Sequence, residues 1–91
     1  MIKAYTLQNA KDKAREVLDE EGHKILAATI HPAEHHWNFH TFTEKQQKEL
    51  QGKYCVCLEL DKNHLNDMHL YIHRGFFTTN TPQLFFVERL H

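Results

Sequence analysis

Two neighbouring segments with strictly alternating side chains constrain the fold of this chain more than any other feature. Apolar residues occupy every second position of Lys53–Leu60 and again of Met68–His73. A period of two is typical of β-strands, because successive side chains point to opposite faces of a sheet. We therefore predict two strands joined by a polar loop, with one face in the core. The opposite face would gather Cys55, Cys57, Glu59, His69, Tyr71 and His73.

The length and charge of the chain limit its organisation. Its 91 residues predict one domain spanning 1–91, and a net charge of −1 gives no basic stripe that would support nucleic-acid binding. The longest run of apolar and small residues, Ile25–Ile30, is too short to cross a bilayer, so we expect no membrane partner. Cys55 and Cys57 are poorly placed for a mutual disulfide in one strand, which favours reduced thiols in the cytoplasm.

The first third of the chain has the pattern of a β-α-β unit. Met1–Leu7 alternates loosely and predicts a strand. Apolar residues at helical spacing predict a helix over Ala10–Glu21, with Asn9 as its N-cap and Gly22 as a left-handed C-cap. The apolar run Lys24–Ile30 then predicts a strand that is covered on both faces.

The rest of the chain predicts further strands and one short helix. Trp37–Phe42 alternates as a third strand, and Thr43 begins a capping-box pattern whose helix ends at Gly52. Leu84–Leu90 fits either a strand or a helix capped by Thr81, and its aromatic and β-branched content favours the strand.

Together these elements predict an α+β fold with a ferredoxin-like order. The sheet would follow β-α-β-β-α-β with one or two extra C-terminal strands, and its helices would lie on one face. Because this arrangement hosts many unrelated activities, the fold alone does not indicate a function.

A metal site is one function that the residue types suggest. Zinc prefers thiolate and imidazole ligands, and the two predicted strands carry Cys55, Cys57, His69 and His73. Their spacing argues against a shared ion, since residues two or four apart in a strand are separated by roughly 7 and 13 Å. We therefore expect no metal and no other cofactor, with the cysteines buried as structural residues.

The nine histidines raise a second alternative, a histidine-rich metal-binding or nucleolytic (toxin-like) domain. In a nuclease, His40, His69 or His73 would act as the general base and Arg74 would stabilise the phosphorane-like charge. No paired acid, glycine-rich phosphate loop or serine accompanies them, so we predict no catalytic residue and no enzymatic activity. Four of the histidines fall within ten residues: His31, His35, His36 and His40.

Adjacent aromatic residues point instead to an interaction surface. In extended strands the members of each Phe-Phe pair face opposite ways, so two helices on one face would leave aromatic side chains uncovered on the other. We predict that a homodimer or another protein covers this face, unless a loop after Gly75 or the C-terminal segment covers it. The predicted contact residues are Trp37, Tyr71, Phe76, Phe77, Phe85 and Phe86.

The N-terminal third also resembles small phage-encoded proteins, some anti-CRISPR inhibitors among them. This resemblance implies a compact protein without catalytic machinery that occludes a site on a larger complex. We therefore interpret the chain as a non-enzymatic protein-interaction module, with inhibition of a host defence complex as the implied role. The residues that carry the resemblance are Lys3–Leu7, the helix Ala10-x-x-x-Ala14-x-x-Val17, Gly22 and Ile25–Ala28.

Overall fold

The protein is a mixed α+β domain, in agreement with the predicted class. The computed structural model describes residues 3–35, 39–78 and 86–90. The helices of the described part are α1 (Leu7–Glu21), α2 (Glu44–Leu50) and α3 (Met68–His73). The strands are β1 (Ile25–Pro32), β2 (Tyr54–Leu60), β3 (Phe77–Thr78) and β4 (Glu88–Arg89). Short 3₁₀ turns connect them: η1 (Gly22–Lys24), η2 (Ala33–His35), η3 (Phe39–Thr41) and η4 (Lys62–Asp67).

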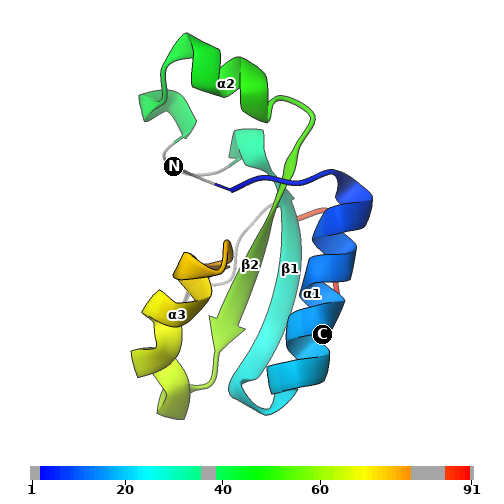
Figure 1. The fold of residues 1–91 in the computed structure, drawn as a ribbon, viewed down its shortest axis with the longest axis vertical. Coiled ribbons are helices and arrows are strands. Elements are labelled where there is room, and N and C mark those ends of the chain that lie inside the picture. The colour runs from blue at the N-terminus through cyan, green and yellow to red at the C-terminus, as the bar shows by residue number, and fades with distance from the viewer. Residues whose placement is uncertain (1–2, 36–38, 79–85, 91) are drawn as a thin grey trace.

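The described strands form one four-stranded mixed sheet in the order β3-β2-β1-β4. The two long strands β1 and β2 pair antiparallel and form its centre, with Ile30 opposite Val56 (Figure 1). β3 runs parallel to β2, and β4 runs antiparallel to β1. The N-terminal segment adds a single antiparallel bridge, in which the amide and carbonyl of Tyr5 exchange hydrogen bonds of 2.8 and 2.7 Å with Tyr54.

Helix α1 is specified by its own sequence. Its N-cap is Thr6, whose hydroxyl accepts a hydrogen bond from the amide of Asn9 at 3.2 Å. The fully buried Ala10, Ala14 and Val17 form its inner stripe, and the two alanines let the helix approach the sheet closely. The predicted helix is confirmed, although Asn9 donates to the cap instead of being the cap.

One hydrophobic cluster joins the helices to the sheet. Residues of α1 and α3 meet the same side of β1 and β2, so both helices contribute to one core. The side chains between these positions point to the other side of the sheet, and there Cys55, Cys57 and His31 are also buried. The cluster consists of Ala10, Ala14, Val17, Ile25, Ala28, Ile30, Val56, Leu58, Leu60, Tyr71 and Phe76.

The prediction of a strand at Met68–His73 is wrong, because this segment is the helix α3. The 3₁₀ turn η4 leads directly into it, and the amide of Arg74 donates to the carbonyl of Leu70 at 3.2 Å, as in an α-helix. Six residues that alternate between apolar and polar do not distinguish a strand from one and a half helical turns. In the helix, Tyr71 points to the core.

Other boundaries also differ from the prediction. In the predicted strand Met1–Leu7, the described residues 3–7 contribute only the bridge at Tyr5, since α1 begins at Leu7. The described part of Trp37–Phe42 is the turn η3 and not a strand. The ferredoxin-like order is therefore not confirmed, and the described elements follow α-β-α-β-α-β-β along the chain.

Of two predictions for later elements, the capping box holds in full and the C-terminal strand in part. Helix α2 begins with the expected capping box, in which Thr43 and Gln46 exchange side-chain hydrogen bonds with each other's backbone amides. The C-terminal strand is present at Glu88–Arg89, and residues 84–85 lie outside the described part. Gly22, by contrast, has a right-handed φ of −57° and continues into η1 instead of ending the helix in a left-handed turn.

Candidate interaction surface

The outer face of α3 carries an unusual share of the exposed apolar surface. Three large apolar residues of this six-residue helix are exposed, with 38% of Met68, 54% of Leu70 and 53% of Ile72 accessible to solvent. They make up half of the large exposed apolar residues in the described part of the chain. That set is Leu26, Met68, Leu70, Ile72, Phe86 and Val87.

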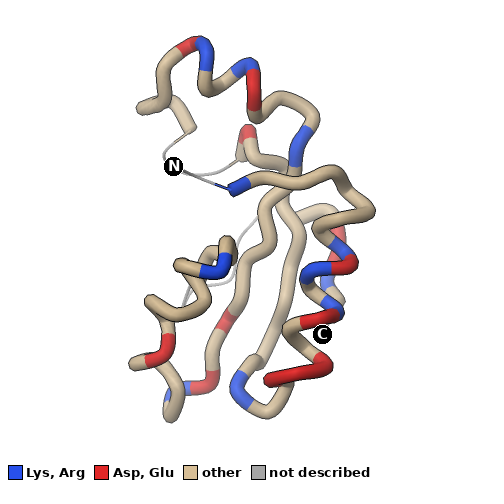
Figure 2. The backbone as a smooth tube through the Cα atoms, viewed as in Figure 1, with Lys and Arg blue, Asp and Glu red and all other residues tan. Residues whose placement is uncertain are grey.

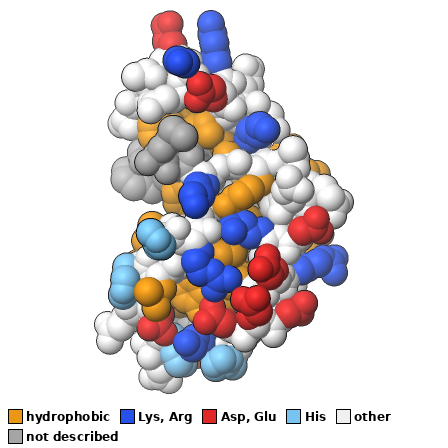
Figure 3. All heavy atoms as spheres, in the orientation of Figure 1, with side chains coloured by type: hydrophobic (Ala, Val, Ile, Leu, Met, Phe, Trp, Pro, Cys, Tyr) orange, Lys and Arg blue, Asp and Glu red, His pale blue; other side chains and the backbone are white. Residues whose placement is uncertain are grey.

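The helical period arranges these side chains into a surface with two imidazoles at its centre. At about 100° per residue, Met68 and Ile72 lie on one side, Leu70 lies across from them, and His69 and His73 project between. Figure 3 shows histidine and apolar side chains gathered along the α3 side of the molecule. We call these five residues the α3 surface.

Contacts with the core and with α1 hold α3 in place. Tyr71 is 2% exposed and packs edge-on against Phe76, with ring centroids 6.5 Å apart. Just after the helix, the Arg74 guanidinium donates to Glu21 at 3.0 Å and to Glu20 at 3.2 Å. These carboxylates belong to the acidic C-terminal end of α1, visible in Figure 2, where a cation is favoured by the helix dipole.

The other end of α3 is also tied to the rest of the domain. Asp67, the residue before the helix, forms an ion pair with Lys24 of η1 at 3.5 Å. With Tyr71 inserted in the core and Arg74 bound to α1, the backbone of α3 is fixed at both ends and in the middle. Because the backbone of this helix is already ordered, binding of a partner would cost little backbone entropy here.

The candidate metal ligands predicted from the sequence are not brought together. Cys55 and Cys57 lie on β2 with their thiols buried, whereas His69 and His73 are exposed on α3. Burial raises the pKa of each thiol to about 12, so both thiols are protonated near neutral pH. Across residues 3–35, 39–78 and 86–90, no three His, Cys, Asp or Glu residues are grouped so that they could hold an ion.

The predicted aromatic contacts are divided between the core and the surface. Phe76 joins Tyr71 in the core, so neither side chain is accessible in the folded chain. Phe77 of β3 is half-buried on the side of Cys57, and Phe86 is exposed with its ring 6.2 Å from that of His31. Trp37 and Phe85 lie outside the described residues.

The residues missed by sequence reasoning are the apolar members of the α3 surface. The alternation assigned Met68, Leu70 and Ile72 to the core and Tyr71 to the open face, and the structure reverses both assignments. The segment Lys62–Asp67 before the helix forms 3₁₀ turns that begin at the Asp61 cap, but its sequence does not decide between a strand and a helix at Met68.

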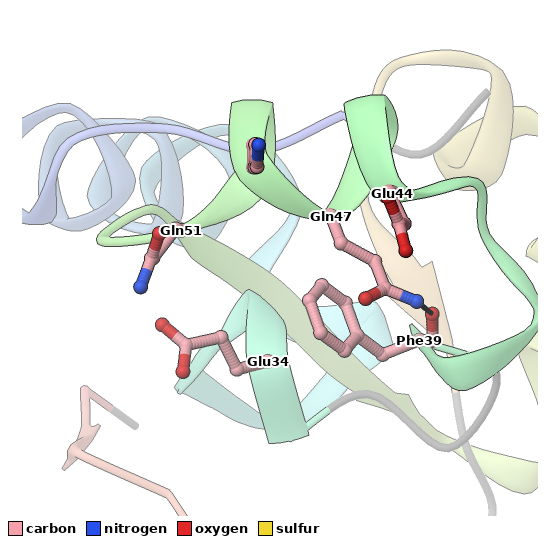
Figure 4. A pocket seen from close by; sticks show the side chains of 6 residues that line it. Glu34, Phe39, Glu44, Gln47 and Gln51 are labelled. Atoms are coloured by element: carbon pink, nitrogen blue, oxygen red, sulfur yellow. Dashed lines mark hydrogen bonds between the residues drawn. The ribbon is translucent and has the colours of Figure 1, made fainter.

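A concave region lies between α2 and the turns η2 and η3. It is a pocket of about 390 Å³ (Figure 4). The side-chain amide of Gln47 donates to the carbonyls of Phe39 at 3.3 Å and Phe42 at 3.0 Å, and Glu34 accepts from the amide of Gly52 at 3.4 Å. These polar groups thus connect α2 to the preceding loops. The lining residues are Glu34, Phe39, Glu44, Gln47, Lys48 and Gln51.

The residues proposed for a nuclease lie on α3, directly after it and in the turn η3. Arg74, the candidate for stabilising phosphate charge, is engaged by Glu20 and Glu21. His69 and His73 are exposed on α3, and His40 is exposed in the turn η3. The buried Tyr71 hydroxyl has no close hydrogen-bond partner but faces the Glu21 carboxylate, and burial, with this carboxylate adding to the effect, raises its pKa to about 12. It is therefore protonated near neutral pH.

Comparisons with protein-family models, curated protein sequences and solved structures find no match to this chain. Among the described residues, every helix is too short or too polar to cross a membrane. No relative therefore supplies a site, and the α3 surface is the feature of the molecule from which a function is best argued.

Proposed function

We propose that this protein is a non-enzymatic interaction module that docks another protein on its α3 surface. The observation that carries the proposal is the exposure of Met68, Leu70 and Ile72 on one short, anchored helix. Since full burial of such a side chain is worth about 1.5–3 kcal/mol, covering the exposed half of each would contribute roughly 1 kcal/mol. Three such contacts, placed on either side of the two histidines, can supply the apolar part of an interface.

The shape of the surface favours a particular mode of binding. Met68 and Ile72 are one helical turn apart, which is the spacing at which a helix inserts apolar side chains into a groove on a partner. The core contact of Tyr71 keeps the helix formed before binding. We therefore expect a partner with an apolar groove, and little change in the backbone of α3 on association.

The finer role is a proposal that rests on the resemblance of the N-terminal third to phage-encoded proteins. On that basis the partner would be a component of a host defence complex in the cytoplasm, and docking would block one of its sites. The genes that neighbour this one supply a direct test, because a phage or mobile element should surround an inhibitor of this kind.

The docking proposal is tested with matched leucine and isoleucine variants. Leu70→Ser and Ile72→Ser remove apolar side chains from the α3 surface, and Leu26→Ser is the control, because Leu26 is 51% exposed on β1. All three positions are exposed, so the stability of each variant should stay within about 0.5 kcal/mol of the parent.

The partner is first identified by cross-linking mass spectrometry with the unmodified protein, and its affinity for each variant is then measured. We expect the dissociation constant to rise about tenfold or more for Leu70→Ser and Ile72→Ser, which corresponds to about 1.4 kcal/mol. Leu26→Ser should bind as the parent does. Equal affinities for all four proteins would contradict docking on α3.

A further inference from the structure

His69 and His73 lie four residues apart in α3, and both side chains are exposed. Residues at this spacing are neighbours on a helix, with Cβ atoms about 5–6 Å apart, so two imidazoles can converge on one ion. The same spacing on a helix supplies the paired histidines of many zinc sites. The helix is continuous between them, since the amide of Arg74 donates to the carbonyl of Leu70.

The described residues of one chain provide only half of a coordination shell at this place. Zinc binds four ligands, and no third histidine, cysteine or carboxylate joins the pair within the described residues. The neighbouring carboxylates have other partners, because Asp67 pairs with Lys24 and both Glu20 and Glu21 pair with Arg74. The described part of the chain therefore leaves half of the shell to be filled by other groups.

A second copy of the chain supplies the missing ligands by symmetry. If two α3 helices face each other across a two-fold axis, each contributes the same pair of histidines, and four imidazoles surround one ion. Met68, Leu70 and Ile72 flank the histidines, so the same contact would remove apolar side chains of both copies from water. Metal coordination and apolar burial thus favour the same arrangement.

We propose that a divalent transition metal of the zinc type bridges two copies of this protein through His69 and His73 of each. Imidazole suits zinc, nickel and copper, whereas magnesium and calcium prefer oxygen ligands. The proposal rests on the proposed function in that it uses the same α3 surface. In the bridged dimer this surface is buried between the two copies and cannot bind another partner.

The test uses tag-free protein purified without a metal column and stripped with EDTA. Light scattering should show a monomer of 10.9 kDa in EDTA and twice that mass with zinc. Titration calorimetry should give one zinc per two chains, and magnesium or calcium should leave the mass unchanged. Zinc that binds once per chain without changing the mass would overturn the bridged dimer.

Matched histidine variants locate the site. His69→Ala and His73→Ala should each weaken zinc-dependent dimerisation by at least roughly tenfold. His23→Ala is the control, since His23 packs against His64 with ring centroids 6.0 Å apart and so belongs to a close histidine pair away from α3. A zinc dimer that persists in both α3 variants, or is lost in His23→Ala, would overturn the assignment to α3.

Two combinations of results distinguish a failure of this inference from a failure of the proposed function. If the partner still binds in EDTA while zinc fails to dimerise the protein, only the metal bridge is overturned. If zinc dimerises the protein as expected while Leu70→Ser leaves partner binding unchanged, the bridge is supported and docking on α3 is overturned.

Discussion

Replacement of Gly75 by alanine should be the most informative single perturbation of the described structure. Gly75 follows α3 and has a φ of +99°, which a residue with a side chain rarely adopts. A Cβ at this position would overlap the hydroxyl of Tyr5 and would lie 2.8 Å from Cδ of Lys3. The Tyr5 hydroxyl is held there by a 3.3 Å hydrogen bond to the carbonyl of Gly75.

Three effects add to the cost of Gly75→Ala. The positive φ costs roughly 1–2 kcal/mol, less about 0.4–1 kcal/mol from the reduced freedom of the unfolded chain. Displacing Tyr5 adds about 1–3 kcal/mol of overpacking, together with about 1 kcal/mol for the lost hydrogen bond. The exposed Lys3 can move away freely. We expect a total loss of about 3–4 kcal/mol in the free energy of unfolding.

Gly52 provides the matched control. Its φ is +76°, but a Cβ there would have no atom within 4 Å, so Gly52→Ala carries the backbone cost of about 1 kcal/mol alone. In urea denaturation the free energies of unfolding of the two variants should therefore differ by at least about 2 kcal/mol. This difference corresponds to roughly 8–16 °C in Tm.

A double-mutant cycle isolates the clash with Tyr5. In a Tyr5→Phe background the hydroxyl is absent, so Gly75→Ala should lose only about 1–2 kcal/mol. If Gly75→Ala loses as much stability in that background as in the parent, or no more than Gly52→Ala, then the packing of the N-terminal segment against Gly75 is refuted.

Two further predictions concern buried polar groups. Tyr71→Phe removes a buried hydroxyl that has no close hydrogen-bond partner but faces the Glu21 carboxylate, so urea unfolding should show a free energy of unfolding within about 1 kcal/mol of the parent, and a larger loss would reveal a strong bond between that hydroxyl and Glu21. Burial raises the pKa of Cys55 and Cys57 from 9.0 to about 12, so the unfolded chain loses these protons first and stability should fall as the pH rises from about 9 to 12. Unfolding curves at about pH 7.5 and 10.5 check this, and the Cys55→Ala/Cys57→Ala variant should show a smaller fall.

Local signals in the sequence were sufficient for several elements. The capping box at Thr43 and Gln46 forms within four residues, and α2 begins where it predicts. The apolar positions of α1 recur over three turns, so its period is unambiguous, and β2 alternates over a full strand between two buried faces. In each case the residues that interact are near in the chain, or the pattern is long enough to have one period.

The tertiary structure decided the identity of α3 and with it the candidate site. Six alternating residues fit a strand and a short helix equally well, and a helix of this length has little stability of its own. It forms because Tyr71 enters the core beside α1 and because Arg74 reaches Glu20 and Glu21, which lie 54 and 53 residues earlier in the chain. Contacts over that separation leave no local pattern, so the exposure of Leu70 and the pairing of His69 with His73 follow only from the folded chain.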